Sequence, residues 1–289
     1  MKRLATLAVV VAAFATVSAG TTAAPGIACG QVLASGTYQL TRSLNCAGLP
    51  AGEAALAVSS AGGVTLDLNG YAIIGPGATT DSTGIQVEGD ESGVPDVTVT
   101  LTNGTIRGFG VAVDDFSAGF DATDVRIAQN GQGIVSAFRF TTTLHESVIA
   151  NNIAGDGIHG SSSGNGQIHV YDSRVSGNGG SGISAHGAFL DVERSVISRN
   201  SSYGIDEDQF GVFLSDDAVD ANGQDGIFLG ADDFPDHYSL LNNSANRNGG
   251  HGIVYSADTF FLTHPLDARG NTARNNATSP QCVNLDCHR

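Results

Sequence analysis

The sequence predicts an all-β protein that folds as a single right-handed parallel β-helix, with disulfides stapling its end caps. The first observation is a glycine followed by isoleucine or valine, which recurs in steps of 22 to 26 residues. The second is an asparagine that usually precedes this glycine by three to five residues. The third is the confinement of all four cysteines to the two ends of the chain. The repeated glycines are Gly84, Gly110, Gly133, Gly157, Gly182, Gly204, Gly226 and Gly252.

Each repeat has the composition of one coil of a β-helix. Short segments such as 124–127 and 195–197 alternate polar and apolar residues, as strands with one buried face do. Asn and Gly tolerate the left-handed backbone angles that sharp corners need, and stacked Asn side chains can form a hydrogen-bonded ladder. A unit of this length holds three short strands and three turns, and it buries its apolar face only by stacking on its neighbours.

Other repeat architectures do not fit this pattern. Leucine-rich repeats need a leucine framework that is absent, and the nine-residue calcium-binding β-roll repeat is too short for this period. A sandwich or barrel would not repeat one dipeptide eight times. We therefore expect one continuous domain after the N-terminal segment.

Residues 1–19 have the pattern of a secretory signal peptide. Lys2 and Arg3 precede an apolar run that ends in small residues, and the alternative is a membrane anchor. Cleavage after residue 19 would change the formal net charge from −16 to −18 and leave no lysine. This acidity argues against nucleic acid and anionic membranes as partners, and against an anionic polysaccharide unless a divalent cation bridges the two. The expected location is extracellular or periplasmic, with no membrane span and an oligomeric state that the sequence leaves open.

The rest of the chain divides into three parts by the repeat. Residues 20–61 are expected to form an N-terminal cap region, 62–277 the β-helix, and 278–289 a C-terminal tail or cap. In an oxidising compartment the even cysteine count predicts two local disulfides, Cys29 with Cys46 and Cys282 with Cys287. The alternative is a four-cysteine metal site joining the two ends, which lie far apart in a solenoid.

The entrance Leu66-Asp67-Leu68-Asn69-Gly70 and the coils of the form Asn-x-x-x-Gly-Ile resemble right-handed β-helix proteins of the pectate-lyase-like superfamily. The resemblance implies the fold and a polysaccharide or cell-surface glycan as the partner. That superfamily hosts lyases, epimerases, hydrolases, adhesins and inert spacers, so the fold does not select among them.

Candidate site residues come from the strand that follows each repeated glycine. The first residue after the glycine should point into the core, and the second and fourth should point outward. Ionisable residues gather in the coils from Gly157 to Gly252. A His beside carboxylates can exchange protons near neutral pH, and a Tyr can serve as the partner acid or base. The predicted catalytic residues are Tyr203, Asp206, Asp208 and His186, and the predicted substrate-binding residues are His159, Asp225 and His251. The alternative is that these are solvated polar residues on an exposed sheet face.

The segment 203–208 resembles a motif of alginate C5-epimerases, Tyr-Gly-Phe/Ile-Asp-Pro-His-Asp/Glu. The resemblance implies that Tyr and His exchange the C5 proton and that Asp lies at the sugar carboxylate. Tyr203 and Asp206 match, whereas Glu207 stands at the Pro and Asp208 at the catalytic His. His186, one coil earlier, could replace that His only if its imidazole reaches the same point.

No cofactor is predicted, although Ca²⁺ is possible. Several acids are candidate ligands, but no spacing among them singles out a metal site; they are Asp216, Asp217, Asp232, Asp233 and Asp236. Two functions therefore stay open. The first is a glycan-binding or structural, surface-associated β-helix without strong catalytic machinery, and the alternative is a polysaccharide lyase or C5-epimerase acting on a uronic acid polymer. Convergence of His186, Tyr203 and Asp206 would favour the enzyme.

Overall fold

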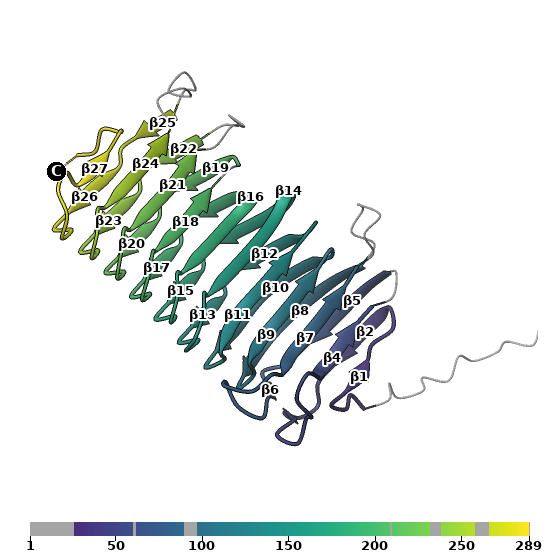
Figure 1. Ribbon diagram of the computed structural model, residues 1–289. Helices are drawn as coiled ribbons and strands as arrows, with labels where there is room; N and C mark the ends of the chain where they lie inside the picture. The colour runs from purple at the N-terminus through teal and green to yellow at the C-terminus, as the bar shows by residue number, and fades with distance from the viewer. Residues whose placement is uncertain are drawn as a thin grey trace, which may run out of the picture.

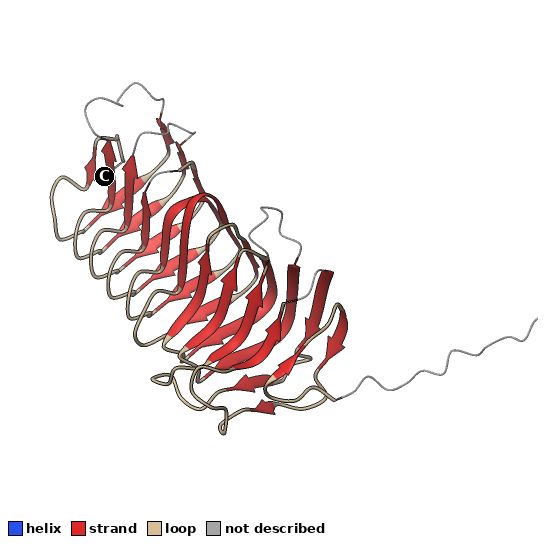
Figure 2. Ribbon diagram, turned by 45° about the vertical axis from the view of Figure 1, so that its right-hand side comes forward, coloured by secondary structure: helices blue, strands red, loops and turns tan. Residues whose placement is uncertain are grey.

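The protein is a right-handed parallel β-helix, here described from a computed structural model (Figure 1). The structure describes residues 26–59, 62–89, 97–208, 210–231, 238–257 and 266–288. The elements of this part of the chain are strands joined by short turns, as Figure 2 shows. The predicted signal peptide lies outside the described residues. Within them, no helix is long and apolar enough to cross a membrane.

Three parallel sheets run along the axis of the solenoid, and each coil adds one strand to each sheet. Sheet 1 contains the strand that follows the repeated glycine. Its strands, in order of pairing, are β1 (Gln31–Val32), β4 (Ala54–Val58), β7 (Thr83–Glu88), β9 (Val111–Phe116), β11 (Gln132–Ala137), the first parts of β14 (Ile158–Tyr171) and β16 (Ile183–Glu193), β18 (Ile205–Asp208), β21 (Ile227–Ala231), β24 (Ile253–Ala257) and β27 (Cys282–Val283).

Sheets 2 and 3 are built in the same way from the segments that follow in each coil. Sheet 2 contains β2 (Gly36–Gln39), β5 (Gly62–Asp67), the first parts of β8 (Val97–Arg107) and β10 (Gly119–Ala128), β12 (Thr141–His145), the second parts of β14 and β16, β19 (Val212–Ser215), β22 (Tyr238–Leu241) and β25 (Leu266–Arg269). Sheet 3 contains β3 (Leu44–Asn45), β6 (Ala72–Ile74), the last parts of β8 and β10, β13 (Val148–Ala150), β15 (Arg174–Ser176), β17 (Val196–Ser198), β20 (Ala218–Asp220), β23 (Ser244–Asn246) and β26 (Thr272–Arg274).

The repeated asparagines form the expected ladder inside the corner that precedes sheet 1. Each buried side chain donates from Nδ2 to Oδ1 of the asparagine in the next coil, at 2.9 to 3.1 Å. The ladder satisfies polar groups that would otherwise be buried without partners. Its members are Asn130, Asn152, Asn178, Asn200, Asn222, Asn248 and Asn276.

The prediction that the repeated Asn and Gly adopt left-handed backbone angles is wrong. The left-handed angles belong to the residue just before the ladder asparagine, such as Asn151, Arg199 and Ala221, and not to the ladder residues or the repeated glycines. The repeated glycine is required because the neighbouring coil leaves no room for a Cβ atom at its position. A Cβ on Gly204 would lie 2.5 Å from the carbonyl oxygen of Gly226 in the next coil.

We expect Gly204→Ala to destabilise the fold by about 2 kcal/mol, because a close-packed interior has no room for the added methyl group. Thermal unfolding followed by circular dichroism measures the loss. Gly48→Ala is the matched control, since a Cβ there has no neighbour within 4 Å. Equal melting temperatures for the two variants would contradict this account of the repeat.

The register of sheet 1 shows that the repeat assigned to Gly110 was aligned wrongly. Val113, and not Val111, pairs with Ile85 on one side and Ile134 on the other. Buried Ala112 therefore occupies the place of the repeated glycine, and Gly110 lies two residues too early. In this coil the outward residues are shifted accordingly, and Asp115 points into the core.

A second ladder lies in the turn between sheets 2 and 3. The backbone N–H of each member donates to the side-chain oxygen of the member in the next coil, at 2.8 to 3.1 Å. Its members are Ser147, Ser173, Ser195, Asp217, Asn243 and Asn271. Asp217 therefore takes a place that uncharged side chains fill in the neighbouring coils.

Both predicted disulfides are present at the ends of the solenoid. Cys29 is bonded to Cys46, and Cys282 to Cys287. This pairing excludes the alternative four-cysteine metal site.

Candidate functional site

The predicted site residues come from successive coils along sheet 1. In β18 the side chains alternate, with Ile205 and Glu207 buried and Asp206 and Asp208 turned outward. In the preceding strand, His186 pairs in register with Asp208. The predicted outward positions two and four residues after the glycine are confirmed in this coil.

His186 lies between the two outward carboxylates of β18. Its Nδ1 is 2.9 Å from Oδ1 of Asp208, and its Nε2 is 4.0 Å from Oδ2 of Asp206. The imidazole is thus set against both carboxylates as an ion-pair contact, without a ring N–H hydrogen bond to Oδ1 of Asp208. Partial burial raises the pKa of Asp206, while the nearby His186 acts in the opposite direction.

Tyr203 lies two residues before the same strand. Its ring packs on Phe228 of the next coil, with centroids 5.5 Å apart. Burial raises the pKa of the Tyr203 hydroxyl, and the charges of Asp206 and Asp225 add to the effect. The hydroxyl therefore keeps its proton at neutral pH and can donate a hydrogen bond to a ligand.

His159 extends this surface by one coil toward the N-terminus. Its ring centroid is 6.1 Å from that of His186, and its Nδ1 is 3.1 Å from Oδ2 of Asp156. The structure thus brings His159, His186, Asp206 and Asp208 together.

Asp225 and His251 have structural partners. Oδ1 of Asp225 accepts from the backbone N–H of His251, and Asp156 makes the equivalent bond to Ser181. Nδ1 of His251 is 2.7 Å from the carbonyl oxygen of Pro280. These contacts hold the turn before sheet 1, and they compete with the predicted role of both residues in substrate binding.

Glu207 carries a buried carboxyl group. From the sequence it was placed only at the Pro position of the epimerase-like motif. The residue has 0% exposure and lies between Ala185 and Leu229 in the inward column of sheet 1. Oε1 accepts from the backbone N–H of Phe210 at 2.9 Å, and burial raises the pKa of the carboxyl well above its usual range. Its place three residues after the repeated glycine, an inward position, is the signal that could have revealed it.

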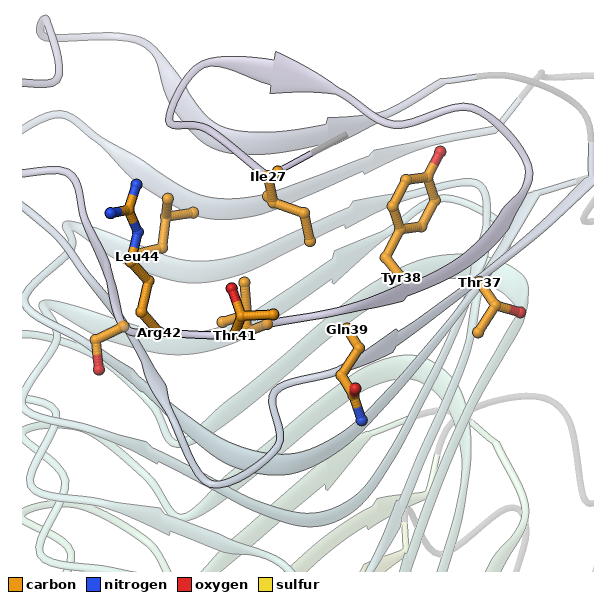
Figure 3. A pocket seen from close by; sticks show the side chains of 10 residues that line it. Ile27, Thr37, Tyr38, Gln39, Thr41, Arg42 and Leu44 are labelled. Carbon is orange, nitrogen blue, oxygen red and sulfur yellow. The ribbon is translucent and has the colours of Figure 1, made fainter. Parts of the chain in front are cut away.

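The candidate surface is a sheet face, and one described hollow lies elsewhere on the molecule. That hollow, of about 530 Å³, lies in the first coil around β2, where Ile27, Tyr38 and Arg42 line it (Figure 3). Figure 1 places β2 and β18 in different parts of the rod. The side chains of Asp206 and Asp208 are 20% and 42% exposed.

The described residues contain no group of three or more His, Cys, Asp or Glu side chains arranged to hold a metal ion. Asp217, one of the acids considered for Ca²⁺, is buried in the turn ladder. Asp232, Asp233 and Asp236 lie outside the described residues.

Fold and surface together define a β-solenoid protein with a polar, acid-rich outward face. The family model described as the right handed beta helix region matches residues 83–234 and 141–287. The chain therefore belongs to the right-handed β-helix family. No curated protein matches the chain.

Several solved structures are similar to this chain at low sequence identity. The A-module of mannuronan C-5 epimerase AlgE6 from Azotobacter vinelandii is 15% identical over 90% of this chain and 73% of that one, with a TM-score of 0.44. The Dettilon tailspike protein is 14% identical over 89% of this chain, with a TM-score of 0.47, and the match spans 60% of the tailspike. The enzymatically active domain of bacteriophage CBA120 tailspike protein 2 is 13% identical over 90% of this chain and 47% of that one, with a TM-score of 0.34.

Proposed function

We propose that this is a secreted protein that binds a neutral glycan on the outward face of sheet 1. The protein does not catalyse a reaction of this glycan. The observation that carries the proposal is the placement of Asp206 and Asp208 around His186, beside the rings of Tyr203 and Phe228. Carboxylates accept hydrogen bonds from sugar hydroxyls, and aromatic rings supply apolar contact area for the faces of sugar rings.

Charge favours a neutral ligand over a uronic acid polymer. The strands of sheet 1 contain no lysine or arginine, and the chain has a formal net charge of −16. A polyuronate brought to this face would meet Asp206 and Asp208 with no lysine or arginine on the strands to neutralise its carboxylates, and like charges repel. Hydroxyl groups of a neutral sugar meet no such penalty.

Secretion is part of the proposal and has two supports. Residues 1–19 have the pattern of a signal peptide. Both pairs of cysteines are joined as disulfides, which persist in oxidising compartments.

A lyase or C5-epimerase is the second candidate, and one contact favours it. Nδ1 of His186 lies 2.9 Å from Oδ1 of Asp208, and a His and a Tyr are the kinds of group that transfer protons at a sugar carbon. Against it, Asp208 occupies the position of the motif's catalytic His, and Nδ1 of His186 is engaged by that same Asp208. The imidazole is therefore already occupied on one side.

We expect the double substitution Asp206→Asn and Asp208→Asn to weaken glycan binding about 10- to 100-fold, because hydrogen bonds to charged groups contribute about 1.5–3 kcal/mol. Isothermal titration calorimetry with soluble neutral polysaccharides (xylan, galactomannan, β-glucan) and with alginate and polygalacturonate measures this. Asp124→Asn, an exposed residue between the sheet 2 and sheet 3 parts of β10, is the matched control.

The same samples test turnover. Absorbance at 232 nm detects unsaturated uronate, and NMR of alginate detects inversion at C5, each with and without Ca²⁺. Product formation by the wild type that is lost in His186→Gln would establish the second candidate and reject the first. Binding of neutral glycans without any product supports the first.

A further inference from the structure

A continuous series of aromatic rings crosses the outward face of sheet 2. It follows four strands that lie side by side, β12, β14, β16 and β19 (Figure 1). Successive ring centroids are 5.0, 6.1, 6.0 and 5.5 Å apart. We call this series the sheet 2 ring strip; in order of contact its members are His145, Tyr171, His169, Phe189 and Phe213.

The core of the solenoid does not account for these rings. The strip residues occupy outward positions that alternate with the buried Val170, Leu190 and Leu214. Phe213 is 42% exposed. Phe189 beside it is half-buried, so the strip offers a partly exposed apolar surface next to polar groups.

Polar groups are set among the rings. The hydroxyl of Tyr171 donates to Oδ2 of Asp191 at 2.6 Å, and Nδ1 of His169 lies 3.6 Å from the same oxygen. Nε2 of His169 is 3.3 Å from Oε1 of Gln167. These contacts fix the rings, and they leave carboxylate, amide and imidazole groups beside them at the surface.

We propose that the sheet 2 ring strip is a second glycan-binding surface, which takes an extended, neutral pyranose chain lying along the solenoid axis. Neighbouring strands are about 4.8 Å apart, so the rings of β12, β14, β16 and β19 follow the solenoid axis coil by coil, with Tyr171 and His169 sharing β14. The rings stack against the apolar faces of the sugars, while Asp191 and Gln167 accept or donate hydrogen bonds at the hydroxyl edges. This surface lies on a different sheet from His186 and does not require binding there.

The mixture of groups favours a sugar over a protein partner or a second copy of this chain. A protein interface of ordinary size has an apolar core from which charged groups are depleted. Here Asp191 lies inside the strip, in contact with Tyr171 and His169. A neutral glycan satisfies such a carboxylate with its hydroxyls while covering the rings, and an anionic polymer would be repelled by it.

The test uses the double substitution Phe189→Ala and Phe213→Ala in the full-length, disulfide-bonded protein. Tyr71→Ala with Ile153→Ala is the control pair, because these side chains are 38% and 57% exposed but lie in turns, off the outward faces of sheets 1 and 2. Both pairs are introduced into the wild type and into the variant that has Asn at positions 206 and 208. Binding of xylan, galactomannan and β-glucan is measured by calorimetry, and self-association by sedimentation velocity.

We expect the Phe189 and Phe213 substitutions to weaken neutral-glycan binding about tenfold or more in both backgrounds, and the control pair to leave it unchanged. Binding that is insensitive to the strip but lost on substitution of Asp206 and Asp208 overturns this inference and leaves the proposed function standing. Binding lost only with the strip supports the inference and rejects the sheet 1 site. Loss of a dimer without loss of glycan binding, or no glycan binding by the wild type, overturns the inference.

Discussion

Ile205→Asp is expected to abolish the cooperative unfolding transition of the protein. Ile205 is fully buried in the inward column of sheet 1, and its neighbours along the stack are Ile183 and Ile227. Neither side chain can donate a hydrogen bond to a carboxyl group. A buried polar or charged group without a partner costs several kcal/mol, a large part of the 5–15 kcal/mol that stabilises a typical domain.

Thermal unfolding by circular dichroism and differential scanning calorimetry measures this effect. Ile205→Val keeps an apolar side chain and is expected to cost only about 1 kcal/mol, so it controls for the change of shape. Asp206→Asn, one residue away on the outward face, is expected to leave melting nearly unchanged. If Ile205→Asp melts like the wild type, the assignment of the inward face is wrong.

Asp217→Asn is expected to stabilise the protein at neutral pH by an amount on the order of 3 kcal/mol. Burial raises the pKa of Asp217 to about 8, and the charges of Asp216 and Glu193 contribute in the same direction. In the next coils, Nδ2 of Asn243 donates to the carbonyl of Leu214. Since Val192 pairs with Leu214, an Asn at position 217 would have the carbonyl of Val192 in the corresponding place.

The sign follows from the raised pKa. The folded state holds the Asp217 proton up to about pH 8, whereas the unfolded chain releases it near the ordinary value of 3.8. The contribution of this group to stability is therefore full below about pH 4, falls as the pH rises toward 8, and is constant above that. Asp217→Asn removes this slope, so its advantage over the wild type should grow between pH 4 and 8.

Urea unfolding at pH 4.5, 6 and 8 measures the free energy of unfolding of both proteins. The reciprocal substitution Asn243→Asp places an acid in the next rung of the ladder, where Nδ2 now donates to Leu214. It should destabilise the protein at pH 8 and recover part of the loss at pH 4.5. A stability difference for Asp217→Asn that does not change with pH would show that Asp217 is not protonated in the folded state.

The periodicity of the sequence was sufficient to predict the fold, because each coil needs a small residue and a hydrogen-bonding side chain at the same two positions. Gly204 is needed where the next coil's carbonyl approaches, and Asn200 where a buried ladder must continue. The disulfides were predictable because cysteines on one terminal coil have few possible partners. Gly110 misled because a glycine in the turn matched the pattern while Ala112 occupied the equivalent position.

The candidate site was predictable only in sheet 1, where counting from the repeated glycine gives the alignment of residues on neighbouring strands. Counting from Gly182 and Gly204 placed His186 beside Asp208 correctly. The sheet 2 ring strip was not found, because the corner between sheets 1 and 2 has a different length in different coils. β14 passes through it as one strand of 14 residues and β16 as one of 11 residues, so equivalent positions in sheet 2 have no fixed spacing in the sequence.

The Cys29–Cys46 bond turns the first coil into a covalent ring, since β1, β2 and β3 all lie between the two cysteines. In a parallel solenoid the hydrogen bonds between coils run along the axis, so a pull on the two ends of the rod would peel coils away one at a time. A force applied at the N-terminus is transmitted from Cys29 through the disulfide directly to Cys46. The segment between these two cysteines therefore carries no load. The first coil would then detach as a closed loop rather than unravel, which makes the disulfide-bonded end of the rod mechanically tougher than its middle.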